Sequence, residues 1–138
     1  MQKKIMVPIG PETRDLKSVH YALAAAERLQ ATVIIVRCTG HREERAAWFD
    51  EALTDLIGSA RLAGLKLTVV DAFGMPEQEV VDLADHERVD LLVLSEDQSR
   101  LEQRVLELAP HLGRLMIQVK EKDTMHLETE KGGSRWQS

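Results

Sequence analysis

Short apolar stretches alternate along this chain with longer segments in which apolar residues return every three or four positions. The short stretches cover residues 4–9, 32–38, 65–70, 90–94 and 115–119. Most of them lack regular polar alternation, which is typical of strands buried on both faces of a parallel sheet. Helical spacing marks the segments at about 15–30, from the loop at 41–44 to 62, from 76 onward and at 99–112. The pattern therefore predicts strands and helices in strict alternation.

This alternation predicts a single-domain α/β protein with a doubly wound, five-stranded parallel sheet and helices on both faces. The stretch at 65–70 alternates more than the others, so we place it at an edge, and the strand order 3-2-1-4-5 is the natural choice. In that order the strands at 4–9 and 90–94 are neighbours whose connections leave in opposite directions. A ligand crevice is expected outside their carboxyl ends. We expect the domain to span residues 1–122, with a polar C-terminal tail at 123–138.

Composition limits the kinds of partner and the cellular compartment that we expect. The formal net charge of the 138-residue chain is −5, which disfavours nucleic acid or an anionic membrane as the main partner. No stretch of about 20 apolar residues is present, so no membrane span is expected. A strand begins almost at the first residue without a signal-peptide core, and the single cysteine excludes an internal disulfide. Together these features predict a cytoplasmic protein.

The predicted crevice brings together residues that follow different strands. Gly10 and Pro11 follow the first strand, Cys38 ends the second, and Ser95, Glu96 and Gln98 belong to the loop after the fourth. That loop contains no glycine and two acids. A phosphate cradle needs converging backbone N–H groups, and glycine allows the close approach. Like charges about 4 Å apart near a surface cost roughly 4 kcal/mol at an effective dielectric of about 20, so the loop disfavours a triphosphate.

The start of the following helix remains a possible anion site, because helix amino termini attract anions. Ser99 and Glu102 have the spacing of a capping box. We expect these two side chains to occupy the N–H groups that an anion would otherwise use.

Other reactive residues have simple structural interpretations beside functional ones. Cys38 is either a small buried hydrophobe or a redox or ligand contact. Asp15, Asp71, Glu96 and Asp97 either cap helices and aid solubility or supply a carboxylate pair for acid–base chemistry. Five histidines are scattered without metal-ligand spacing: His20, His41, His86, His111 and His126. We predict no metal site, no cofactor and no catalytic residue.

Two apolar features suggest protein contacts. The last strand lies at a predicted edge and carries neither charge nor proline that would block pairing with another chain. Its residues, the predicted dimer contact, are Leu115, Met116, Ile117, Gln118 and Val119. Trp48 and Phe49 are adjacent in a helix and cannot both face one core. Either one of them is half exposed, or the pair marks a contact surface.

Four stretches together resemble the universal stress protein family. They are residues 5–9 (IMVPI), 74–80 (GMPEQEV), 90–94 (DLLVL) and 102–110 (EQRVLELAP). The similarity runs from about residue 5 to 119. Many members bind ATP through Gly-x2-Gly-x9-Gly-Ser/Thr after the fourth strand, and the first two glycine positions match Ser95 and Gln98. The rest of that motif is missing, because the chain from Gln98 to Pro110 is several residues too short, and Gly10 replaces the aspartate expected after the first strand.

The resemblance implies a stress-response role and a homodimer formed through the last strand. We therefore expect a non-catalytic stress-response or regulatory domain that acts as a homodimer through protein contacts, has an unidentified partner protein and does not bind ATP tightly. The alternative is a nucleotide- or small-anion-binding sensor with a rebuilt crevice and at most slow ATP hydrolysis. An enzyme with unrecognised chemistry is the third possibility.

Overall fold

The structure is a computed structural model that describes residues 2–10, 13–38 and 47–120. Its strands are β1 (Lys4–Ile9), β2 (Thr32–Cys38), β3 (Leu67–Ala72), β4 (Leu91–Ser95) and β5 (Met116–Val119). Its helices are α1 (Lys17–Leu29), α2 (Ala47–Leu62), α3 (Pro76–Glu87) and α4 (Ser99–Leu108), with short 3-10 helices η1 (Glu96–Gln98) and η2 (Pro110–Leu115). The predicted tail at 123–138 lies outside the described residues, so the domain boundary at residue 122 stays a prediction.

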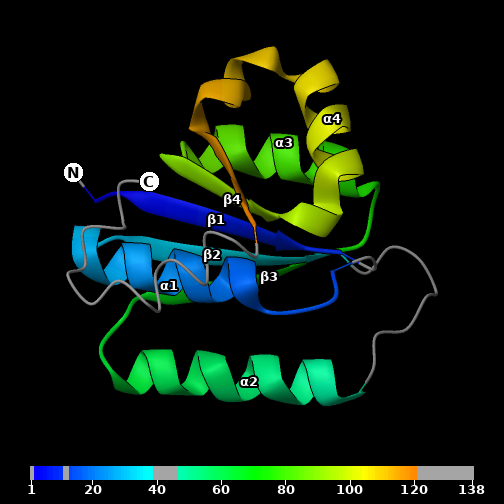
Figure 1. Ribbon diagram of the computed structural model, residues 1–138. Helices are drawn as coiled ribbons and strands as arrows, with labels where there is room; N and C mark the ends of the chain where they lie inside the picture. The colour runs from blue at the N-terminus through cyan, green and yellow to red at the C-terminus, as the bar shows by residue number, and fades with distance from the viewer. Residues whose placement is uncertain (1, 11–12, 39–46, 121–138) are drawn as a thin grey trace.

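The strands form one parallel sheet in the order β3-β2-β1-β4-β5. Helices α1 and α2 lie on one face of it and α3 and α4 on the other (Figure 1). The doubly wound α/β fold, its strand order and the edge position of β3 are therefore confirmed. Each crossover carries a helix because parallel neighbours must be joined from one end of the sheet to the other.

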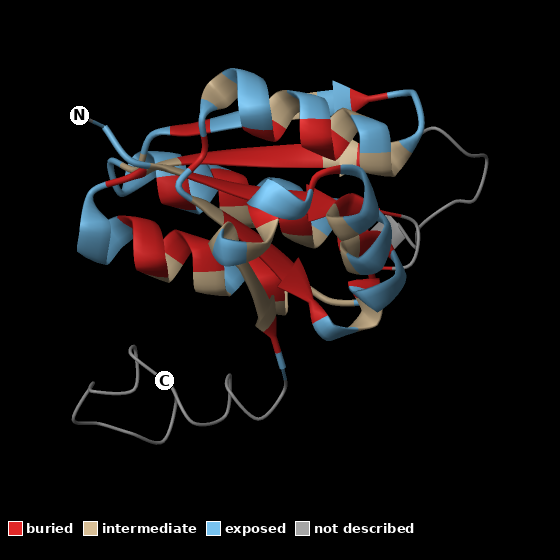
Figure 2. Ribbon diagram, turned by 90° about the horizontal axis from the view of Figure 1, so that it is seen from above, coloured by how far each residue is buried: buried red, intermediate tan, exposed pale blue. Residues whose placement is uncertain are grey.

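The core is divided between the two faces of the sheet (Figure 2). Ile5, Val7 and Ile9 of β1 pack toward α1 and α2, whereas Met6 packs toward α3 and α4. Successive strand residues point to opposite faces, so a central strand covered on both faces must be apolar throughout. This requirement explains the uninterrupted apolar stretches in the sequence.

The segment predicted as one helix at 99–112 contains two elements. Helix α4 ends at Leu108, and the 3-10 helix η2 follows from Pro110 to Leu115. A proline disfavours helical backbone in the residue before it, and Ala109 accordingly has φ −145° and ψ 77°. Strand β5 therefore begins at Met116, and Leu115 belongs to the turn before it.

The adjacent aromatic residues at the start of α2 have different surroundings. Phe49 is 2% exposed and belongs to the core beneath α1 and α2, whereas Trp48 is 57% exposed. Their rings meet edge to face with centroids 5.7 Å apart. The interpretation that one of the two is half exposed is confirmed, and that residue is Trp48.

This difference predicts unequal effects of two neighbouring substitutions. Phe49→Ala should lower the free energy of unfolding by about 3 kcal/mol or more, because it leaves a cavity in the core. Trp48→Ala should cost about 1 kcal/mol, mainly the aromatic contact. Urea unfolding followed by circular dichroism measures both, and equal losses would contradict the placement of the two rings.

Candidate functional site

The central strands β1 and β4 separate before either one ends. Strand β1 pairs with β2 along its whole length, from Lys4–Thr32 to Ile9–Arg37. Its pairing with β4 includes only Ile5–Leu91 and Met6–Leu92. Beyond that point a gap opens between them at their carboxyl ends. In doubly wound folds this is the place where ligands bind.

The side-chain amide of Gln98 spans this gap. Its Nε2 donates to the Pro8 carbonyl oxygen at 3.0 Å, between residues 90 positions apart, and its Oε1 accepts from the Ser95 N–H at 2.9 Å. Gln98 is fully buried. A glutamine amide can both donate and accept, so it replaces ladder bonds that the separating strands no longer make.

A second link joins the loops that follow β1 and β4. The Asp97 carboxylate accepts from the Arg14 N–H at 3.0 Å through Oδ2 and from the Ser95 hydroxyl through Oδ1. On the other side, the Gly10 N–H donates to the Thr13 hydroxyl at 3.0 Å, and Thr13 is buried. The backbone donors at the mouth of the gap are thus already bonded to side-chain oxygens of the protein.

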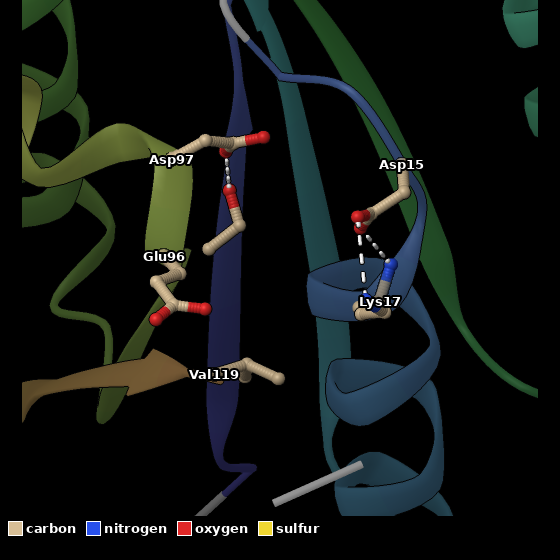
Figure 3. A pocket seen from close by; sticks show the side chains of 6 residues that line it. Asp15, Lys17, Glu96, Asp97 and Val119 are labelled. Atoms are coloured by element: carbon tan, nitrogen blue, oxygen red, sulfur yellow. Dashed lines mark hydrogen bonds and ion pairs between the residues drawn. The ribbon is translucent and has the colours of Figure 1, made fainter. Parts of the chain in front are cut away.

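A cleft of about 310 Å³ lies beside these links, lined by Asp15, Lys17, Ser95, Glu96, Asp97 and Val119. Figure 3 shows Glu96 and Asp97 on one side of the cleft and Asp15 with Lys17 on the other. Lys17 is close to Asp15, with Nζ 3.7 Å from Oδ2. Three carboxylates against one ammonium give the cleft a negative charge, which repels an anionic ligand.

The structure brings most of the predicted crevice residues together but gives them unequal roles. Ser95 and Glu96 line the cleft, Gln98 is buried in the gap, and Gly10 lies in the turn closed by Thr13. Cys38 is buried in the core on the α3 and α4 face, away from the cleft lining. Pro11 lies outside the described residues.

Several residues of the site were not in the predicted crevice set. They are Thr13, Asp15, Lys17, Asp97 and Val119. Asp15 and Asp97 stood among the candidate carboxylates, but the sequence contains no sign that Asp97 accepts from the loop after β1. Val119 was predicted only as part of the dimer contact, although the strand order places it here, since β5 ends beside β4.

The predicted capping box at Ser99 and Glu102 is wrong. The box is formed one turn earlier, where Ser95 accepts from the Gln98 backbone and the Gln98 side chain accepts from the Ser95 backbone. The Ser99 hydroxyl instead donates to the Glu96 carbonyl oxygen, and Glu102 accepts from Gln118. The 3-10 turn η1 inserted before α4 moves the cap toward β4.

The residues that the structure describes include no group of three or more His, Cys, Asp or Glu side chains placed to hold a metal ion. None of the helices in this described part combines the length and apolarity that crossing a bilayer requires.

Comparison with known proteins identifies the fold. The family model described as "Universal stress protein family" matches residues 1–108. This chain belongs to the universal stress protein family. The match includes β1, β4 and the residues that close the gap between them. No curated protein sequence matches the chain.

Solved universal stress proteins share the architecture at low sequence identity. A universal stress protein in complex with cAMP is 20% identical, with a TM-score of 0.60 over 86% of this chain and 97% of that one. The universal stress protein from Archaeoglobus fulgidus in complex with dAMP is 17% identical, with a TM-score of 0.59 over 87% and 98%. UspA from Lactobacillus plantarum is 17% identical, with a TM-score of 0.54 over 86% and 96%. Similarity at this level establishes the fold.

The bonding of Gln98 predicts a stability effect that its side-chain volume alone would not produce. Gln98→Ala leaves the Pro8 carbonyl and the Ser95 N–H without their partner, at about 1–3 kcal/mol for each buried group. We expect the free energy of unfolding to fall by about 3 kcal/mol and the Ser95 amide to exchange its hydrogen faster. Urea unfolding and native-state hydrogen exchange measure these effects.

The matched control is Gln78→Ala, which removes an exposed glutamine that donates to Asp82 in α3. Its effect should stay within about 0.5 kcal/mol. Equal losses for the two variants would show that the gap does not depend on the amide.

Proposed function

We propose that this universal stress protein is a non-catalytic, cytoplasmic regulatory domain that acts as a homodimer through protein contacts and does not bind ATP tightly. The observation that carries the proposal is the buried Gln98 amide between β1 and β4, at 3.0 Å from the Pro8 oxygen. The protein's own atoms take the position at which this class of fold binds its ligands.

Hydrogen bonding and charge both argue against tight binding of a nucleotide. A phosphate would have to displace side-chain oxygens from the Gly10, Arg14 and Ser95 N–H groups. Each bond lost without an equal replacement costs about 1 kcal/mol or more. Glu96 and Asp97 add repulsion at the same mouth. The family's ATP chemistry therefore does not fit the residues present.

The second candidate is a sensor of nucleotides or small anions. It is favoured by the cAMP and dAMP complexes of two similar solved structures and by Lys17, which lines the cleft. Binding through this route would require the anion to approach Lys17 past Asp15, its neighbour at 3.7 Å.

A thermal-shift measurement separates the two candidates. With 1 mM Mg-ATP we expect the melting temperature to rise by less than about 1 °C, because a ligand far below saturation adds almost no stability. Saturation at about 100 times the dissociation constant would add about 2.7 kcal/mol, equal to a rise of several degrees. A rise of that size favours the sensor.

The charge argument has its own test. The double variant Glu96→Gln with Asp97→Asn removes two negative charges from the cleft, and we expect ATP affinity in calorimetry to increase about tenfold after allowance for solvent screening. The control, Glu51→Gln with Asp55→Asn, removes two charges from the exposed surface of α2. Equal gains in both would assign the effect to net charge alone.

The proposed dimer uses the edge of β5. Within the described residues β5 pairs with β4 on one side, and its other side ends the sheet. Met116, Ile117 and Gln118 are half-buried, and the Gln118 amide is held by Glu102 at 2.7 Å. The strand carries no charge and no proline, the residues that commonly block strand addition, so its free edge is open to pairing with a second copy.

Light scattering during size-exclusion chromatography tests this interface. We expect the wild type to have twice the chain mass of 15.6 kDa and Ile117→Lys to have the chain mass itself, since a lysine at the pairing edge opposes strand addition. Thr68→Lys places the same charge on β3, the other edge strand, and should leave the dimer intact. A monomeric wild type would exclude pairing through β5.

A further inference from the structure

A second concavity of about 380 Å³ lies between α3 and the outer part of the sheet and shares no lining residue with the cleft beside Gln98. Its lining residues are Val36, Val70, Ala72, Glu79, Asp82, Leu83 and His86. The strand residues come from β2 and β3, and register pairs Val36 with Val70. The remaining residues belong to α3. The groove therefore has a sheet as its floor and one helix as a wall.

Helix α3 presents two faces to its surroundings. Val80, Val81 and Ala84 are buried against the sheet. Glu79, Asp82, Leu83 and His86 follow the three- and four-residue spacing of an adjacent face, which lines the groove. Leu83 and Val70 are only half-buried. Apolar surface thus remains accessible between the helix and the edge strand.

The loop from β3 to α3 adds exposed apolar side chains at one end of the groove. Phe73 is 73% exposed and Met75 is 57% exposed. Both must lie at this end, because the loop joins Ala72 to Pro76, where α3 begins. The loop lies close to the α3 wall, since a Cβ on Gly74 would be 2.6 Å from the flexible Glu79 carboxylate. Aromatic and methionine side chains are enriched in protein interfaces.

The charges around the groove are mostly negative. Glu79 and Asp82 stand on its α3 wall, and His86 is the remaining titratable group that lines it. Asp71 of β3 belongs to a different contact, because it pairs with Arg37 at 2.7 Å and alternation directs it away from the side of Val70 and Ala72. A partner that fits this groove needs apolar side chains for the floor and basic side chains beside α3.

We propose that this groove binds an amphipathic, basic helix of a partner protein. A helix beside α3 would complete the second layer over β2 and β3, since packed helices lie about 8–10 Å apart. Its apolar side chains contact Val70, Leu83 and Phe73, and its lysines or arginines lie beside Glu79 and Asp82. The inference rests on the proposed role in protein contacts and specifies the surface and the chemistry of the partner.

The test uses a synthetic peptide of about 14 residues, roughly four helical turns, with leucines on one face and lysines on the other. Its binding to the full-length, ¹⁵N-labelled protein is followed by amide chemical shifts. The expected result is saturable shifts at the amides of Val70, Phe73, Leu83 and their neighbours, with helical ¹³Cα shifts in the peptide. Shifts centred on Glu96 and Asp97, or an extended bound peptide, would overturn the proposal.

Charge variants separate local complementarity from general attraction to an acidic protein. Asp82→Lys should weaken peptide binding about tenfold, because it places like charges together at the groove. Asp55→Lys makes the same change on the exposed surface of α2 and should alter binding less than about twofold. Both sites are exposed, so neither change threatens the core. Equal weakening would show that net charge alone drives the binding.

This result is independent of the nucleotide and dimer measurements. Nucleotide binding would change the amide chemical shifts of Ser95 and Gln98, whereas peptide binding in the groove would change those of Val70 and Leu83. A peptide that binds the groove of a monomer would refute the dimer and support the groove. If the protein is a dimer that does not bind nucleotide, and the peptide causes no amide shifts at the groove, only the proposal for the groove is refuted.

Discussion

The amide of Gln98 bridges the sheet where its two central strands part. A doubly wound sheet must diverge between β1 and β4, because their crossovers leave toward opposite edges. Divergence leaves backbone groups without ladder partners, and buried groups of this kind need replacements. The Gln98 side chain supplies a donor to Pro8 and an acceptor to Ser95. Few other side chains can offer both at one point.

The same bonds also affect whether a ligand can enter the gap between β1 and β4. Related architectures leave this divergence available to a ligand, but here protein atoms fill it and Asp97 ties the two flanking loops together. The cleft that remains beside it is lined by more carboxylates than cations. This arrangement underlies the proposal that nucleotide binds weakly at this end of the sheet. The surfaces proposed for recognition are instead the β5 edge and the groove beside α3.

Periodicity predicted the architecture because each strand and helix must bury its apolar residues. The continuous stretch at Ile5–Ile9 signals a strand covered on both faces, and Ile5 and Met6 do pack on opposite sides. Element ends were harder to predict. The box assigned to Ser99 and Glu102 had the right spacing, but the 3-10 turn before α4 let Ser95 and Gln98 form it instead. Local spacing cannot distinguish two such capping boxes, because the one that forms is also stabilised by the bond from Gln98 to Pro8, 90 positions away.

The sequence by itself determined the fold class, the strand order, the family and the acidic, glycine-free loop after β4, because these depend on local pattern and composition. Only the tertiary structure decided that Gln98 turns inward to close the gap, that Asp97 joins the loop after β1, and that Phe73 and Met75 stand beside an apolar groove. These features come from residues far apart in the chain. Their contacts exist only once the sheet has brought its carboxyl ends and its edges into place.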